Sequence, residues 1–295
     1  MTSRHIPPFF LYLVVFMCLP LIAQKKTIDP ALLNKANAGD AQAQLAVGEA
    51  YLSGISVAQD YTAAASWLQK AADQGLAHAQ YDLGTLYEAG NGLPQDDARA
   101  AAAYRKAAEQ GYAPAQLHLG LLCDRGAGIP QDYAQAAGWY RKAALQNVPE
   151  AQYNLGTFYE RGIAVPQDYS QAADLYRRAA EQGNASAQFN LGLLYDNGTG
   201  VEKNYAQAAA WYAKAAEQGL PRAQFNLGSM YANGQGVPVN LVESYVWLDL
   251  AAKNWSGSHQ QEAEKTRDMV GQHLTPADLA TAQARSAKWL ADHQK

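Results

Sequence analysis

Cysteine is scarce in this 295-residue sequence, which contains only Cys18 and Cys123. Cys18 lies in an N-terminal segment that we expect to be removed, which leaves Cys123 alone. A single thiol cannot form an internal disulfide, so the fold must be stabilised by packing. Cys123 occupies a position that is tyrosine in related segments of the chain, and we expect it to be buried and unreactive.

The sequence also lacks a large excess of charge of either sign. Its formal net charge is −4, and charged residues make up 17% of the chain. There is no basic surplus to neutralise phosphates, so nucleic-acid binding is not expected. Hydrophobic residues make up 48%, enough to form a sizeable core.

Only one long apolar run is present, at residues 9–19, with Arg4 and His5 before it and Pro20 and Ala23 after it. The run is much shorter than the roughly 20 residues of a membrane-spanning helix. This layout indicates a secretory signal peptide over residues 1–23 rather than an uncleaved membrane anchor. We therefore expect a periplasmic or secreted protein, with no membrane insertion after signal cleavage.

Motifs of common catalytic sites are missing as well. The patterns G-x-S-x-G, H-E-x-x-H and G-x-x-x-x-G-K-[ST] do not occur. We predict no enzyme activity, no cofactor and no metal. His78 and His118 could approach each other, with Asp82 as a third metal ligand, but two solvated histidines are the simpler interpretation.

What the sequence has in abundance is repetition at a stride of 36 residues. One glutamine and two glycines return at this stride in six ungapped units over residues 40–255; the glutamines are Gln44, Gln80, Gln116, Gln152, Gln188 and Gln224. A fixed period of this length predicts a solenoid, in which each unit buries its apolar face against its neighbours.

Each unit is predicted to form two antiparallel helices. In the fifth unit, apolar residues recur at helical spacing over residues 184–197, and Gly198 is placed to end that helix in a left-handed conformation. Gly192 indicates a close backbone contact with the partner helix. Asn204 should cap the second helix, with Gln207 reaching back as its capping-box partner. Tryptophans at one register of the second helices, Trp67, Trp139, Trp211 and Trp247, are interpreted as core.

The two ends of the array differ from its units. Residues 24–39 are predicted to form a linker and an N-terminal cap helix, because residues 29–39 match only the second half of a unit. Residues 256–295 are predicted to form two C-terminal capping helices. The first covers residues 258–274, and the second has Thr275 as N-cap and Pro276 at its first position.

The repeated unit, A-x-A-Q-x-x-L-G-x-x-Y-x-x-G-x-G-V-x-x-D-Y-x-x-A-x-x-W-Y-x-K-A-A-E-Q-G, resembles the Sel-1-like repeat family, a branch of the tetratricopeptide-type helical repeats. The resemblance covers residues 29–255, and Cys123 is one of its few departures. It implies an all-α, right-handed solenoid with helical caps that acts as a protein-interaction scaffold. It names no partner.

In such arrays the first helices line the concave side, and one stripe of them should face a partner. We call this the concave stripe. Its aromatic, polar and acidic registers supply the predicted binding residues: Tyr81, Asp82, Glu88, His118, Asp124, Tyr153, Asn154, Glu160, Phe189, Asn190, Asp196, Phe225 and Asn226. Amides can bond a peptide backbone, aromatics supply apolar contact, and carboxylates favour a basic segment.

Two other interpretations of these residues stay open in the sequence. The aromatics could be half-buried packing between units, and the carboxylates could be ordinary solvated helix ends. The predicted partners are other proteins or peptides, including cell-envelope components. The alternative functions are a peptidoglycan- or glycan-binding envelope module and, in third place, a lactam-binding or hydrolytic enzyme.

Overall fold

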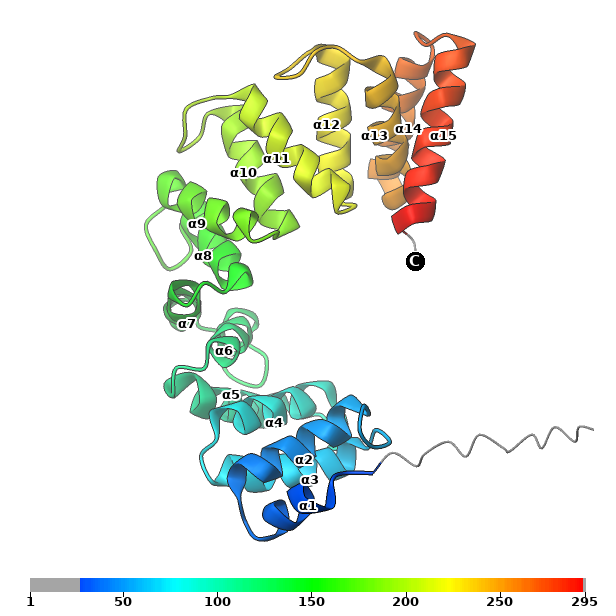
Figure 1. Ribbon diagram of the computed structural model, residues 1–295. Coiled ribbons are helices and arrows are strands. Elements are labelled where there is room, and N and C mark those ends of the chain that lie inside the picture. The colour runs from blue at the N-terminus through cyan, green and yellow to red at the C-terminus, as the bar shows by residue number, and fades with distance from the viewer. Residues whose placement is uncertain (1–26, 294–295) are drawn as a thin grey trace, which may run out of the picture.

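The chain is an α-solenoid. The computed structural model describes residues 27–293, so the predicted signal peptide, residues 1–23, lies outside the described residues. The described part consists of fifteen α-helices without a strand, and consecutive helices pack on one another in chain order. They form an open arc with α1 (Pro30–Asn37) at one end and α15 (Pro276–His293) at the other (Figure 1). This confirms the predicted fold class.

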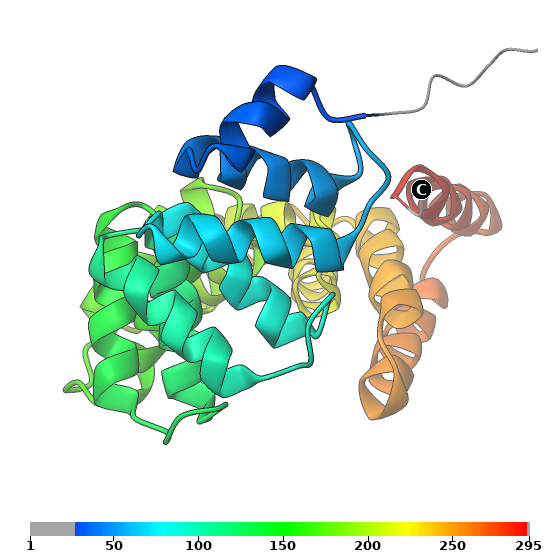
Figure 2. The ribbon, with the colours of Figure 1, turned by 90° about the horizontal axis from the view of Figure 1, so that it is seen from below.

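The helices alternate between two sets. The first helices of the six repeats are α2 (Ala41–Ser53), α4 (Ala77–Ala89), α6 (Ala113–Arg125), α8 (Pro149–Arg161), α10 (Ala185–Asn197) and α12 (Pro221–Asn233). The second helices are α3 (Tyr61–Asp73), α5 (Asp97–Glu109), α7 (Tyr133–Leu145), α9 (Tyr169–Glu181), α11 (Tyr205–Glu217) and α13 (Leu241–Asn254). After α13 come α14 (Gly257–Gly271) and α15. Seen from below, the helices change direction along the array, so the arc is also twisted (Figure 2).

Glycine and a short polar side chain set the helix ends in each repeat. Gly198 ends α10 with a φ of 71°, a left-handed conformation that glycine adopts without strain. Asn204 caps α11, since its Oδ1 accepts from the Gln207 backbone N–H at 3.0 Å. The prediction that the Gln207 side chain accepts in return from the Asn204 N–H is wrong, because that N–H donates to the Tyr195 carbonyl at 2.9 Å.

The mid-helix glycine makes room for a tyrosine ring in four of the six repeats, whereas Gly48 and Gly228 face a leucine side chain. A Cβ atom added to Gly192 would lie 2.7 Å from the ring of Tyr212, and the same conflict recurs at Gly84 with Tyr104. Since these tyrosines are fully buried between the two helices of one repeat, the glycine lets a large ring fill the pair. The expected close backbone contact is present as well, since the same Cβ atom on Gly192 would lie 3.4 Å from the Ala208 carbonyl oxygen on the partner helix.

The repeating glutamines form a buried ladder that ties each repeat to the one before it. The Nε2 of each first-helix glutamine donates to a carbonyl of the preceding helix at 3.0–3.3 Å, as Gln152 does to Ala144. Its Oε1 accepts from the end of its own second helix, as Gln152 does from Gln182 at 2.9 Å. Buried amides with both ends bonded fix the relative position of consecutive helices.

The C-terminal helices cover the apolar second helix of the last repeat. Asp249 on α13 is nearly fully buried and accepts hydrogen bonds from Lys253 at 2.6 Å, Arg267 on α14 at 3.1 Å and Ser286 on α15 at 2.6 Å. One carboxylate therefore joins three helices. Arg285 on α15 adds a bond of 2.7 Å to Glu243.

Candidate functional site

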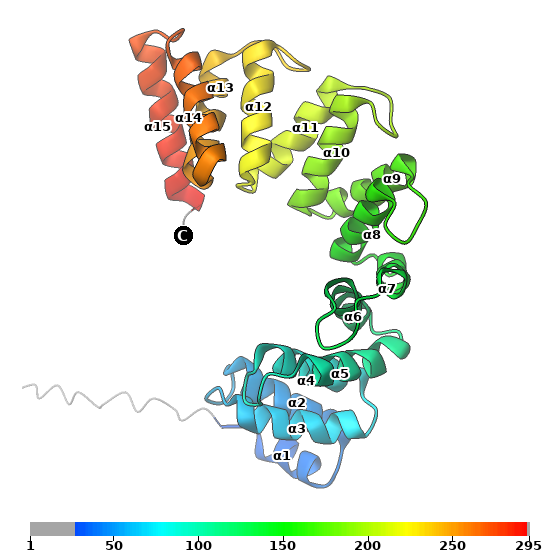
Figure 3. The same ribbon diagram turned by 180° about the vertical axis from the view of Figure 1, so that it is seen from behind.

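The concave stripe lies on the first helices, which we expect from the sequence to line the inner side of the arc. Figure 3 shows the arc from behind, and there, as in Figure 1, α6 lies inside α7. Apart from Phe189, the stripe residues named from the sequence are half-buried. Half-buried polar side chains on one face can contact a partner with their exposed ends, while the buried part of each side chain is held by its neighbours.

The acidic register of the concave stripe is held by buried tyrosines. Each carboxylate accepts a hydrogen bond from the phenol hydroxyl of the second helix in its own repeat: Glu88 from Tyr104 at 2.6 Å, Asp124 from Tyr140 at 3.1 Å, Glu160 from Tyr176, and Asp196 from Tyr212 at 3.3 Å. The carboxylates are therefore not ordinary solvated helix ends. One bond uses only part of the acceptor capacity of a carboxylate, which leaves room for a basic partner.

The tyrosine hydroxyls also connect neighbouring repeats. Burial, the first cause, raises the pKa of Tyr176, and the bond to Glu160 adds to the rise, while a side-chain hydrogen bond from Asn190 on the next first helix lowers it. Tyr212 stands in the same relation to Asp196 and Asn226. The acidic and asparagine registers thus lie beside the same phenol.

The aromatic register is packing in part. The Phe189 side chain is only 7% exposed, lies 5.6 Å from the Tyr212 ring between centroids and is covered by the Arg222 guanidinium at 4.4 Å. Tyr81 and Tyr153 pack in the same way on the buried tyrosines of their repeats, but keep part of their surface exposed. Phe225 lies against Trp255. Phe189 therefore has little surface to offer a partner, and Tyr81 and Tyr153 have more.

The N-terminal part of the stripe carries a cluster that does not repeat. His78 lies 3.3 Å from a carboxylate oxygen of Glu49 and 3.8 Å from one of Asp82. Burial, the largest cause, raises the pKa of Asp82 to about 6, while His78 lowers it and Glu49 raises it further. The three side chains have ligand atoms within 4.8 Å of one another, a spacing that a divalent cation could bridge. In the structure, the His78 ring contacts both carboxylates directly.

His78 and His118 do not share a site as a metal interpretation needs. His118 pairs with Glu88 at 3.4 Å and lies against Tyr81 and Tyr104, whereas His78 turns to Glu49 on the preceding repeat. Each histidine therefore contacts a carboxylate and is not simply solvated. Glu49 was missed in the sequence because its register holds no other charged residue.

Cys123 is buried, with 1% of its surface exposed, as predicted. Burial raises the pKa of its thiol, which keeps it in the less reactive protonated form. Among the described residues, no helix combines the length and apolar character needed to cross a membrane.

Helix pairs stacked at a fixed stride into an open arc define an α-solenoid repeat protein. The model of the Sel1 repeat family matches six consecutive segments: residues 40–76, 77–112, 113–148, 149–184, 185–220 and 221–254. The chain belongs to the Sel1 repeat family. The fold of this family is a repeat scaffold that generally mediates protein–protein interaction, rather than a catalytic fold.

One solved structure agrees with this assignment, and a second is a more distant likeness. A Sel1 repeat protein from Oxalobacter formigenes is 38% identical over 79% of this chain and 68% of its own, with a TM-score of 0.69. A protective antigen of uropathogenic Escherichia coli with an SLR fold is 29% identical over 89% of this chain and 71% of its own, with a TM-score of 0.41. No curated protein matches the chain.

Proposed function

We propose that the protein is an exported scaffold that binds a basic, extended polypeptide segment along the concave stripe. The observation that carries the proposal is the row of carboxylates at Glu88, Asp124, Glu160 and Asp196, each oriented by a buried tyrosine hydroxyl. Side chains that are already ordered lose little freedom on binding, so contacts to a partner are not offset by an ordering cost. The signal-like residues 1–23 support export to the periplasm or beyond.

The side-chain chemistry of the concave stripe favours a polypeptide over other partners. The asparagine side chains beside the carboxylates can donate to and accept from a peptide backbone, while the carboxylates pair with lysine or arginine. A glycan would need open aromatic faces for stacking, whereas Phe189 is buried under Arg222, and Tyr81 and Tyr153 pack on buried tyrosines and are only partly exposed. Cell-envelope proteins with basic segments therefore fit the surface better than a polysaccharide does.

The test compares two charge-matched triple variants. D124N/E160Q/D196N removes three stripe carboxylates, and D174N/E181Q/E217Q removes three exposed carboxylates of the second helices. Fluorescence anisotropy with a labelled lysine- and arginine-rich peptide should show binding to the parent and control proteins, and at least about tenfold weaker binding to the stripe variant. Added salt should weaken the parent complex.

Equal affinity of both folded variants for the basic peptide would exclude the concave stripe as its site. Sedimentation with purified cell wall separates the glycan alternative. Retention in the wall pellet that the N154A/N190A/N226A variant loses, without binding of any peptide, would replace the polypeptide by a glycan partner.

A further inference from the structure

One register of the second helices is filled by tryptophan in most repeats and by alanine in one. The register holds Trp67, Trp139, Trp211 and Trp247, with Leu175 and Ala103 in the other two repeats. Each indole packs against an apolar cluster; Trp67, in the first repeat, packs on the cluster that contains Ala36 of the cap helix α1 and Val47 of α2. These tryptophans pack against the core, as interpreted from the sequence, but they lie at its edge and are only half-buried.

A lysine three residues later covers three of these indoles. The Nζ atoms of Lys70, Lys142 and Lys214 lie 4.0, 4.0 and 4.1 Å from the ring centroids of Trp67, Trp139 and Trp211. The array thus contains a recurrent arrangement of an indole between two repeats beneath an ammonium group, a cation–π contact.

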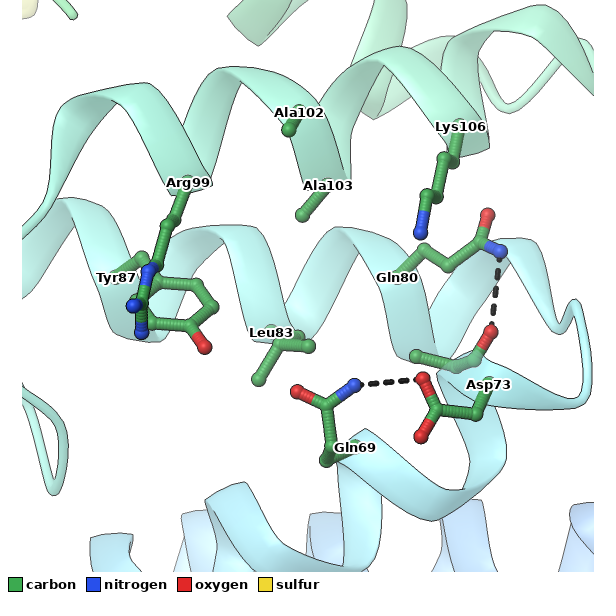
Figure 4. Close-up of a pocket in the computed structure, with 10 residues that line it drawn as sticks. Gln69, Asp73, Gln80, Leu83, Tyr87, Arg99, Ala102, Ala103 and Lys106 are labelled. Carbon is green, nitrogen blue, oxygen red and sulfur yellow. Dashed lines mark hydrogen bonds between the residues drawn. The ribbon is translucent and has the colours of Figure 1, made fainter.

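In the second repeat the lysine is kept and the indole is missing. Ala103 stands at the tryptophan position and Lys106 at the lysine position. A cavity of about 150 Å³ lies there between α3, α4 and α5, which we call the Ala103 pocket. Figure 4 shows Lys106 and Arg99 reaching into it from α5, with Leu83 of α4 between them and Gln69 of α3 opposite.

The other exception to the register leaves less space. Leu175 is itself only 6% exposed, and it packs with the apolar cluster of Tyr140 and Phe158. The Ala103 pocket therefore arises because a small side chain stands where a large one is needed, while the surroundings of the indole are retained. A cavity of about 150 Å³ is large enough to bind a benzene-sized ring.

We propose that the Ala103 pocket receives the tryptophan side chain of a partner polypeptide. Like the sites that hold an indole elsewhere in the chain, the pocket has an ammonium group at its rim, and Ala72 and Leu83 are among its apolar lining residues. Arg99, whose guanidinium lies 5.7 Å from the Tyr87 ring centroid, adds a second cation at the rim. Since the tryptophans of this register are half-buried, a ring from outside can fit with one edge in solvent.

This site shares no residue with the concave stripe and goes beyond the function proposed above. The stripe selects charge, whereas the pocket selects an aromatic ring on another face. A partner that used both would gain from the second contact at a raised effective concentration. Failure of the stripe experiment leaves the pocket untouched, and the reverse holds as well.

The test uses N-acetyl-L-tryptophanamide as a minimal tryptophan side chain with its backbone. Titration followed by backbone NMR should give saturable shifts at Ala102 and Lys106, and N-acetyl-L-alaninamide should give none. The A103W variant fills the pocket from within, so its affinity for the tryptophan compound should fall at least about tenfold and its thermal midpoint should rise by about 2–4 °C. The control A134W adds a tryptophan at an exposed site and should change neither.

Two further variants keep the proposal open to contradiction if A103W does not fold. W139A creates the same alanine–lysine pair in the third repeat, and the number of bound tryptophan molecules should rise from one to two. K106M removes the ammonium group and should weaken binding by about 2–5-fold. Unchanged affinity in A103W, or shifts confined to other helices, would overturn the site. Binding of free indole-3-acetate without binding of the tryptophan compound would overturn the polypeptide occupant.

Discussion

At the scale of single residues, burial decides which side chains of a repeating surface acquire a special role. Asp82 and Asn154 occupy the same register, yet only Asp82 is a carboxylate, and burial beside Glu49 raises its pKa to about 6. A repeat array spreads similar side chains evenly, so one substitution at one register is enough to make a local site. Ala103 is the second example, by loss of volume rather than by gain of charge.

The raised pKa of Asp82 predicts a pH-dependent stability. The folded state binds the proton of the Asp82 carboxyl group more tightly than the unfolded state does. The stabilisation that protonated Asp82 contributes is therefore fully present below the ordinary pKa of 3.8 and is lost as the pH rises through about 6. D82N should therefore be more stable than the parent at pH 7.5, by about 1–3 kcal/mol, and lose this advantage near pH 4. Thermal denaturation at both pH values measures this difference, with D174N, a change of an exposed residue on α9, as control. A stability difference that is independent of pH would contradict the assignment.

At the scale of helices, much of each pair could be predicted from the sequence. Apolar periodicity, Gly198 and Asn204 define where a helix begins and ends, because these signals act within one turn. The link from Tyr176 to Glu160 could not be predicted in the same way. Its partners lie 16 residues apart on different helices, and the direction of the hydroxyl follows only from how the pair packs.

The same limit applied to the candidate site. The concave registers were found from their spacing, but the sequence could not separate Phe189, which is buried, from Tyr153, which is half-exposed. Both are aromatic at one register, and the cover over Phe189 comes from Arg222 in the next repeat. The sequence interpretation took the tryptophan row as core and did not predict the Ala103 pocket, because its volume depends on how α3, α4 and α5 pack.

The buried carboxylate of Asp249 should make the C-terminal cap, α14 and α15, sensitive to acid. Burial raises the pKa of Asp249, but the hydrogen bonds from Lys253, Ser286 and Arg267 outweigh it, so the pKa is lowered. The stability that the ionised Asp249 carboxylate contributes is present above the ordinary pKa and is lost as the pH falls through the lowered pKa of the folded state. D249N should destabilise α14 and α15 by about 2–4 kcal/mol at pH 7, since it weakens a buried ionic network.

Hydrogen exchange measures this effect helix by helix. Amides of α14 and α15 should exchange faster in D249N, while those of α8, several repeats away, keep their rates. D268N is the matched control, because Asp268 also bonds Arg267, at 2.7 Å, but is exposed. Equal acceleration in both variants would show that the buried carboxylate has no special role.

At the scale of the whole molecule, stability should be a sum over neighbouring repeats. Deletion of residues 148–183 removes one full unit and brings Gln188 to the place of Gln152, so its amide can bond the Ala144 carbonyl. We expect an unchanged helix content per residue by circular dichroism and a moderately lower thermal midpoint. Deletion of residues 148–165 removes only half a unit, leaves a helix without its partner and should give an aggregating protein. Loss of folding in both deletions would contradict the nearest-neighbour description.

The glutamine ladder has a consequence for how such a chain can evolve. Because every rung is made by the same amide at the same place, unequal crossing-over between two repeats of the gene joins compatible halves. Array length can then change by whole units without a new interface having to be selected. The second repeat, with Ala103 at the tryptophan position, would be exchanged as a whole unit. Arrays with no such repeat, or with several, can therefore arise in one genetic step.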